Sequence, residues 1–162
     1  MIGDSSLNHL LDGFEIVDWP VRPESLPNTT KCFVYVFLIS KGAIWIPFYV
    51  GQTERLVGRM KDYTQAYFSA STDFRVGIAI RCFTEGMHCS VKVGYKQSEH
   101  NLQDESRMIR ELLLLGFRLL NSLPGYDYQK SNMKDEQEVI RLFCRMIMNQ
   151  ATGASPPAII SP

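Results

Sequence analysis

The sequence of 162 residues contains no apolar run approaching the roughly 20 residues that a membrane-spanning helix requires. Its first residues, 1–6, also lack the basic and then apolar order of a signal peptide. These two absences predict an intracellular protein, cytoplasmic or associated with a nucleoid or nucleus, without a membrane partner. The apolar fraction of 45% and the charged fraction of 21% are ordinary for one globular domain with its own core.

Cysteine and histidine are too scattered to indicate a zinc site. No two cysteines form a C-x-x-C pair, and the histidines do not complete a ligand pattern. The cysteines are Cys32, Cys82, Cys89 and Cys144, and the histidines are His9, His88 and His100. In an intracellular chain this usage predicts free, mostly buried thiols.

The formal net charge of the chain is zero, so the chain as a whole does not attract a polyanion. The charges are nevertheless unevenly distributed. Residues 1–30 hold one Lys or Arg against five Asp or Glu, residues 31–134 hold 14 against 9, and residues 135–162 hold 2 against 3. The mildly basic middle fits a DNA-facing core, and an excess of this size also fits chance.

The hydrophobic pattern predicts an α+β fold. Residues 32–39 and 43–50 are rich in β-branched and aromatic side chains and flank a Lys-Gly turn, which is typical of a β-hairpin in which Pro47 belongs at an edge or bulge. Residues 89–95 alternate as a third strand. Helices are expected after a Thr53 cap, over 101–115 and over 134–149, whereas 74–83 fits a helix or a strand.

These elements divide the chain into four segments. Residues 1–30 form an N-terminal arm with a short helix and then an extended or looped stretch, because prolines interrupt it. Residues 31–126 form the main domain, 127–150 a C-terminal helical extension, and 151–162 a disordered tail.

Six polar residues punctuate the main domain in a way that suits phosphodiester cleavage. They are Tyr35 and Tyr49 on the hairpin, Arg59 and Tyr63 one turn apart on the next helix, Glu105 early in the long helix, and Asn121 after its end. One carboxylate with waters and phosphate oxygens is enough to hold magnesium. An arginine stabilises charge on the phosphoryl transition state, and a phenol with a lowered pKa can take a proton from water. Asn121 can orient Glu105 or anchor the loop.

Several of these residues stand in a pattern that resembles the GIY-YIG nuclease signature. The hairpin part comprises Val34, Tyr35, Phe48, Tyr49, Val50, Gly51, Gln52 and Thr53, and the helix part Leu56, Arg59 and Tyr63. In that family, Y-I-G-x-T-x-x-L-x-x-R is followed four residues later by His or Tyr. Residues 105–121 resemble the family's later pattern of a glutamate opening a helix, a glycine and a terminal asparagine.

The resemblance covers roughly residues 32–126 and implies a three-stranded antiparallel sheet flanked by helices, here with an extra C-terminal helix. It implies hydrolysis of DNA with one Mg²⁺ or Mn²⁺ ion held by Glu105 and with Arg59 on the phosphate. The general base would be Tyr35 or Tyr49, and Tyr63 would lie beside the attacking water or a phosphate. Two positions depart from the pattern: Phe33 replaces the first glycine, and Gln52 stands where some members carry lysine.

Two other functions stay open beside an active endonuclease. The domain can have kept the fold as a catalytically inactive DNA-binding or assembly module, or it can be an α+β protein-interaction domain in which the pattern is accidental. Candidate DNA contacts are Lys61, Arg75, Arg81, Lys92 and Lys96. The helix over 134–149 is expected to pack on the domain, with a homodimer face as the alternative.

Overall fold

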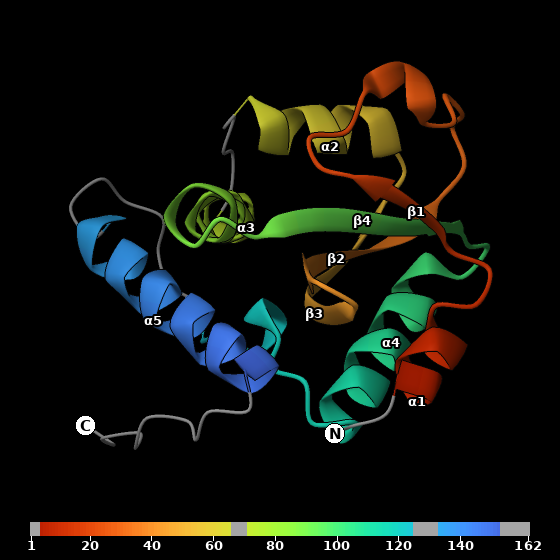
Figure 1. The fold of residues 1–162 in the computed structure, drawn as a ribbon. Helices are drawn as coiled ribbons and strands as arrows, with labels where there is room; N and C mark the ends of the chain where they lie inside the picture. The colour runs from red at the N-terminus through yellow and green to blue at the C-terminus, as the bar shows by residue number, and fades with distance from the viewer. Residues whose placement is uncertain (1–3, 66–70, 125–132, 153–162) are drawn as a thin grey trace.

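The computed structural model describes residues 4–65, 71–124 and 133–152. The elements are α1 (Asp4–Leu10), β1 (Glu15–Asp18), η1 (Pro23–Ser25), β2 (Phe33–Lys41), β3 (Ile44–Thr53), α2 (Leu56–Thr64), α3 (Ser71–Arg81), the π-helical turn η2 (Cys82–Gly86), β4 (Ser90–Gln97), α4 (Asn101–Leu114), η3 (Leu120–Ser122) and α5 (Met133–Thr152) (Figure 1). The α+β class expected from the sequence is confirmed.

The sheet has four strands in the order β1-β4-β2-β3, and every neighbouring pair is antiparallel. The expected number of three strands is wrong because residues 15–18, placed by the sequence in a looped arm, pair with β4. Ile16 lies opposite Gly94 and Val17 opposite Val93. The prolines that argued against regular structure follow this strand at positions 20 and 23, so they do not interrupt its hydrogen bonds.

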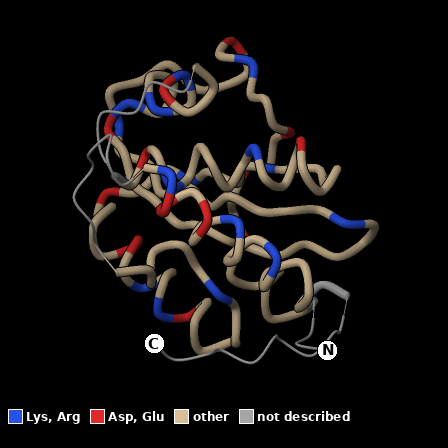
Figure 2. The backbone as a smooth tube through the Cα atoms, turned by 90° about the vertical axis from the view of Figure 1, so that its left-hand side faces the viewer, with Lys and Arg blue, Asp and Glu red and all other residues tan. Residues whose placement is uncertain are grey.

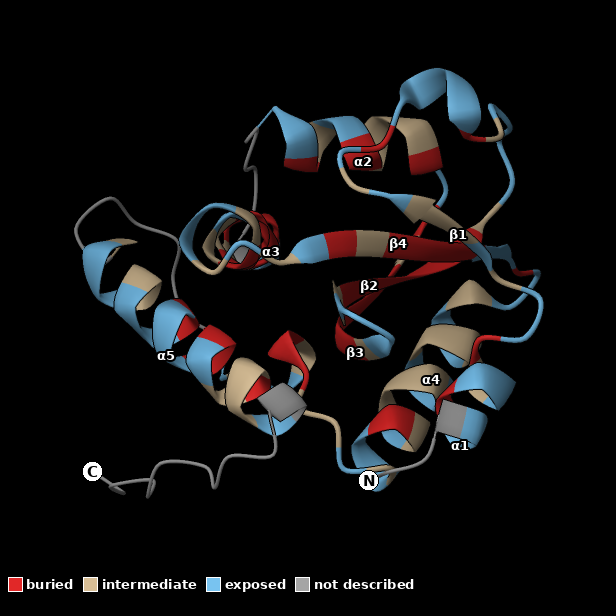
Figure 3. Ribbon diagram, viewed as in Figure 1, coloured by how far each residue is buried: buried red, intermediate tan, exposed pale blue. Residues whose placement is uncertain are grey.

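The β2–β3 hairpin is the most deeply buried part of the sheet. All seven residues from Phe33 to Ile39 are buried, as the unbroken apolar run predicts for a strand covered on both faces (Figure 3). Its register shifts between Phe37, which faces Tyr49, and Leu38, which faces Pro47. Phe48 is therefore the extra residue of a β-bulge on an edge strand, and Pro47 beside it confirms the edge or bulge position expected of this proline.

Helices cover both sides of the sheet (Figure 1). On the first face, α2, α3 and α5 pack against one hydrophobic cluster that includes Tyr35, Phe37 and Val93. On the second face, α1 and α4 pack against another cluster that includes Val34, Val36 and Leu38. Alternate residues of β2 thus belong to opposite layers, as the two-residue period of a strand requires.

The C-terminal helix lies on the first face through Ile140, Phe143, Cys144 and Ile147, which are all buried. Val139 and Leu142 of the same helix point outward, with exposed fractions of 44% and 55%. The ambiguous segment 74–83 is helical, in α3 and η2. Residues 151 and 152 end α5, and the rest of the expected disordered tail, 153–162, lies outside the described residues. No helix of the described part is both long and apolar enough to cross a bilayer.

Candidate active site

Two tyrosines of the hairpin lie side by side on the first face of the sheet. Tyr35 of β2 pairs with Gly51 of β3, and Phe37 pairs with Tyr49, so the two phenols are diagonal neighbours. Their ring centroids are 6.2 Å apart. Both phenols therefore lie on the same face of the sheet. Both rings are buried, with exposed fractions of 0% for Tyr35 and 7% for Tyr49.

Helix α2 adds a third phenol and a cation. Its buried stripe consists of Leu56, Met60 and Tyr63, which follow helical spacing. The hydroxyl of Tyr63 lies 2.9 Å from that of Tyr35, and the guanidinium carbon of Arg59 lies 5.0 Å from the centre of the Tyr63 ring. Arg59 Nε also donates to the Tyr35 hydroxyl over 3.4 Å. Tyr35, Tyr63 and Arg59 therefore form one contact group.

Arg59 has a partner that the sequence analysis missed. Its Nη2 lies 2.6 Å from Oδ1 of Asp73 in α3, a side chain that is 1% exposed against 21% for Arg59. An almost fully buried carboxylate needs such a counter-charge. The sequence offered one sign of this pair. Asp73 is an acidic residue directly before the apolar stretch 74–83, where a helix packed on a sheet has no evident need for a charge.

Asn121 anchors the chain after α4 to the edge of the sheet. Its side-chain amide accepts a hydrogen bond from the Val50 N–H over 3.0 Å and donates one to the Val50 carbonyl over 2.7 Å. Both Val50 groups belong to β3, whose outer edge pairs with no other strand of the described sheet. Of the two roles open to Asn121, the structure displays the anchoring one.

Glu105 faces a hollow that Tyr49 also lines. The hollow has a volume of about 290 Å³ and is bounded by Tyr49, Thr72, Arg75, Val76, Glu105, Leu120, Asn121 and Leu123. Glu105 is half-buried, and no other residue of the described ranges forms a hydrogen bond or ion pair with its carboxylate. Burial raises its pKa above the ordinary value for glutamate.

Burial dominates the electrostatics of the three phenols. It raises the pKa of Tyr35, Tyr49 and Tyr63, the last two well above the ordinary value, and the charge of Arg59 acts in the opposite direction on each. The charge of Arg59 lowers the pKa of Tyr49 and the charge of Glu105 raises it, so Tyr49 links the tyrosine group to the hollow. Burial also lowers the pKa of Arg59, but its interactions with the phenols of Tyr63 and Tyr35 and with the carboxylate of Asp73 raise it by more, and the guanidinium stays charged.

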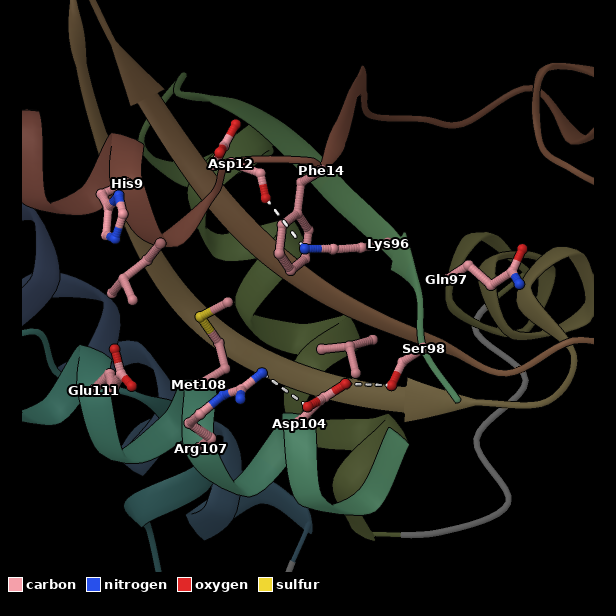
Figure 4. Close-up of a pocket in the computed structure, with 12 residues that line it drawn as sticks. His9, Asp12, Phe14, Lys96, Gln97, Ser98, Asp104, Arg107, Met108 and Glu111 are labelled. Carbon is pink, nitrogen blue, oxygen red and sulfur yellow. Dashed lines mark hydrogen bonds and ion pairs between the residues drawn. The ribbon is translucent and has the colours of Figure 1, made fainter. Parts of the chain in front are cut away.

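The five expected DNA contacts do not gather around Arg59. Lys92 and Lys96 alternate with the first-face residues Val91, Val93 and Tyr95 along β4, and so project on the second face. Lys92 pairs with Asp18 at 2.5 Å. Figure 4 shows Lys96 in a separate pocket between α1 and α4, with its ammonium near the Asp12 carbonyl.

The other three basic residues lie on helices of the first face. Arg75 of α3 pairs with Glu136 of α5 at 2.7 Å, and its side chain is 12% exposed. Lys61 of α2 and Arg81 of α3 are exposed. Figure 2 shows basic and acidic positions interspersed along the described chain, as the zero net charge suggests.

The donor set at the hollow fits one hard cation held loosely. Within the described ranges, no three His, Cys, Asp or Glu side chains gather as a metal cage. Glu105 supplies the carboxylate of the hollow, since Arg75, which also lines it, pairs with Glu136, and the amide oxygen of Asn121 is engaged by Val50. Magnesium is commonly held by one or two carboxylates, with waters and substrate phosphates completing its shell.

Comparisons with models of known protein families, with curated proteins and with solved structures give no match to this chain. The resemblance to the GIY-YIG nucleases therefore rests on the residues of the motif and on their arrangement.

Proposed function

We propose that the chain is a metal-dependent endodeoxyribonuclease of the GIY-YIG type, which hydrolyses DNA phosphodiester bonds. The observation that supports it best is the convergence of its motif residues. Tyr35, Tyr63 and Arg59 are in contact, and Tyr49 joins them to the hollow that Glu105 faces. These residues come from two strands and two helices, and ordinary core packing does not require polar side chains at each place.

Tyr49 is the better placed of the two candidate bases. Its ring lines the hollow with Glu105, whereas Tyr35 is completely buried and its hydroxyl is engaged by Tyr63 and Arg59. The raised pKa of Tyr49 keeps its phenol protonated at neutral pH, so proton transfer requires nearby positive charge. A divalent ion bound by Glu105 would supply that charge and polarise the phosphate.

Arg59 is the proposed phosphate stabiliser. Its Nη2 is held by Asp73 and its Nε by Tyr35. Nη1 is the remaining nitrogen of the guanidinium, and it is the donor proposed for a phosphate oxygen. Tyr63 fixes the guanidinium from the side through its ring face.

One observation favours a second function, a catalytically inactive DNA-binding or assembly module. The Asp73 carboxylate already neutralises Arg59, and phosphate must compete with a buried partner 2.6 Å away. In a decayed site, this pair would serve only to join α2 to α3.

A homodimer through the outward side of α5, where Val139 and Leu142 are exposed, stays a prediction that light scattering can test.

The two functions differ in a plasmid assay. The purified chain is incubated with supercoiled DNA and Mg²⁺, Mn²⁺ or a chelator, beside Glu105→Gln. The expected result is metal-dependent nicking that Glu105→Gln lowers at least about a hundredfold. Glu111→Gln is the matched control, because it removes a carboxylate from the same helix at the separate pocket on the second face.

Three outcomes are decisive. Equal cleavage by Glu105→Gln and the parent chain would show that the metal role of Glu105 is wrong. No cleavage under any condition, with DNA binding that weakens as salt rises, would support the inactive module. Neither cleavage nor binding would contradict both the nuclease and the DNA-binding module.

A further inference from the structure

Arg75 of α3 joins three parts of the chain beside the hollow that Glu105 faces. Its Nε donates to Oε1 of Glu136 in α5 over 2.7 Å, its Nη1 donates to the Leu123 carbonyl over 3.2 Å, and its Nη2 donates to the Pro124 carbonyl. Each of its three nitrogens therefore has an acceptor. The two charged side chains are 12% and 11% exposed, so salt and solvent screen their attraction little.

The same guanidinium borders the place where the metal ion is proposed to bind. Arg75 and Glu105 both line the hollow of about 290 Å³. Of the described residues that line it, only Glu105 is acidic. A positive charge beside this carboxylate repels a divalent cation and attracts the carboxylate to itself. The charge of Arg75 therefore opposes metal binding at Glu105 unless another group neutralises it.

Glu136 neutralises that charge from outside the hollow. It lies in the first turn of α5, four positions before Ile140, and Phe143 and Ile147 follow at further steps of three and four. These three apolar residues are buried against the domain, so helical spacing places Glu136 on the face of α5 that packs on it. The packing of α5 thus brings a carboxylate to Arg75 without adding one to the lining of the hollow.

We propose that Glu136 is a positioning residue for the metal site. By holding Arg75 toward α5 and neutralising its charge, it leaves the Glu105 carboxylate available to a divalent cation. This role rests on the proposed function, because it requires that Glu105 binds the metal. It also gives the C-terminal helix a part in the site, although this helix lies outside the segment that resembles the nuclease motif.

Binding of Mn²⁺ to the full chain, measured by calorimetry without DNA, tests the role of Glu136. Glu136→Gln should lower the affinity at least about tenfold, because the charge of Arg75 is then no longer neutralised. Arg75→Gln, which removes that charge, should bind Mn²⁺ at least as tightly as the parent. The double variant should regain the parental affinity to within about threefold.

Glu138→Gln is the matched control. It makes the same change in the same helix, but it breaks the exposed ion pair of Glu138 with Arg141, away from the hollow. Its affinity for Mn²⁺ should equal that of the parent. Glu105→Gln should abolish the binding, which shows that the signal comes from the hollow.

The double variant separates this role from a merely structural one. If the pair only fastened α5 to α3, both single variants would weaken Mn²⁺ binding, and the double variant would bind no better than either. Thermal unfolding in chelator shows whether each variant is folded. If Glu136→Gln does not fold, Arg75→Gln alone still decides, since a loss of affinity of about tenfold in that variant would contradict the proposal.

Several results would overturn the role of Glu136. They are equal affinities of Glu136→Gln and the parent, no recovery in the double variant, binding that persists in Glu105→Gln, and no Mn²⁺ binding by the parent chain. Failure of the nuclease function is a different outcome. A chain that binds Mn²⁺ as expected but does not nick DNA would contradict the nuclease and leave the role of Glu136 in place.

Discussion

The ring of Tyr35 lies directly over Gly51, its partner across the β2–β3 ladder. A Cβ atom built at Gly51 would lie 2.3 Å from Cζ of Tyr35 and 2.4 Å from its hydroxyl oxygen. The glycine of the Tyr-x-Gly motif is thus required by the upstream tyrosine, since only a residue without a side chain leaves room for the phenol to reach Tyr63 and Arg59. Two parts of the motif that are 16 positions apart are explained by one contact.

Gly51→Ala should therefore destabilise the protein by about 2 kcal/mol, because the added methyl group overpacks a ring that is fully buried. Urea denaturation measures the change in the free energy of unfolding. Gly86→Ala is the control, since a Cβ there meets nothing within 4 Å. Equal effects of the two substitutions would mean that Tyr35 does not restrict position 51.

The sequence predicts most of the secondary-structure elements of this fold, but not every contact between them. The hairpin, α4 and α5 follow from strong apolar periodicity, and helical spacing places Arg59 and Tyr63 one turn apart, but the contact of both with Tyr35 is seen only in the structure. β1 was missed because four residues carry little periodicity and their pairing with β4 is a contact across some 78 positions. The hydrophobic pattern of residues 15–18 does not indicate which distant strand they pair with.

Asp73 was missed for a related reason. Its role depends on the packing of α3 against α2, which brings a buried carboxylate to Arg59, and a single acidic residue carries no spacing that predicts this. The two-residue period of a strand places Lys92 and Lys96 on one face of β4. The sequence alone did not show that the tyrosines would lie on the opposite face of the sheet.

Asp73→Asn should lower the free energy of unfolding by about 3 kcal/mol, because it leaves the charged Arg59 without its buried counter-charge. Chemical denaturation at neutral pH measures this. Asp62→Asn, which removes the ion pair between Asp62 of α2 and the exposed Arg55 directly before that helix, should cost less than about 1 kcal/mol. If the two variants are equally stable, the Arg59–Asp73 pair contributes no more than a surface pair.

Asn121→Leu should cost about 2 kcal/mol, since it removes two hydrogen bonds and leaves the Val50 N–H and carbonyl without their partner. Thermal unfolding measures the loss, and Asn121→Asp, which keeps the acceptor but not the donor, should be intermediate. Mg²⁺ affinity measured by calorimetry should change less in either variant than in Glu105→Gln. A loss of affinity in Asn121→Leu as large as that in Glu105→Gln, with affinity kept in Asn121→Asp, would assign Asn121 to the metal site instead.

Alkaline pH should destabilise the fold through its buried phenols. Burial raises the pKa of Tyr35, Tyr49 and Tyr63 above the unfolded value of about 10. A raised folded pKa contributes stability that is complete below the unfolded pKa and is lost as pH rises through the folded one. The free energy of unfolding should therefore fall above about pH 10.

Tyr63→Phe separates this effect from the titration of other groups. The variant loses a hydrogen bond to Tyr35 and should be about 1 kcal/mol less stable at pH near 8, yet its stability should fall less steeply with rising pH. Urea titrations across this range measure both values. Parallel curves for parent and variant would mean that Tyr63 does not take part in the alkaline transition.

The outer edge of β3 has a consequence for self-association. An uncovered edge strand offers free N–H and carbonyl groups as a template on which strands of other molecules can assemble. Here Pro47 lacks an N–H to offer, the adjacent bulge disrupts the regular repeat, and Asn121 occupies both groups of Val50. The same asparagine that fastens η3 to the sheet thus protects its most apolar hairpin from edge-to-edge aggregation.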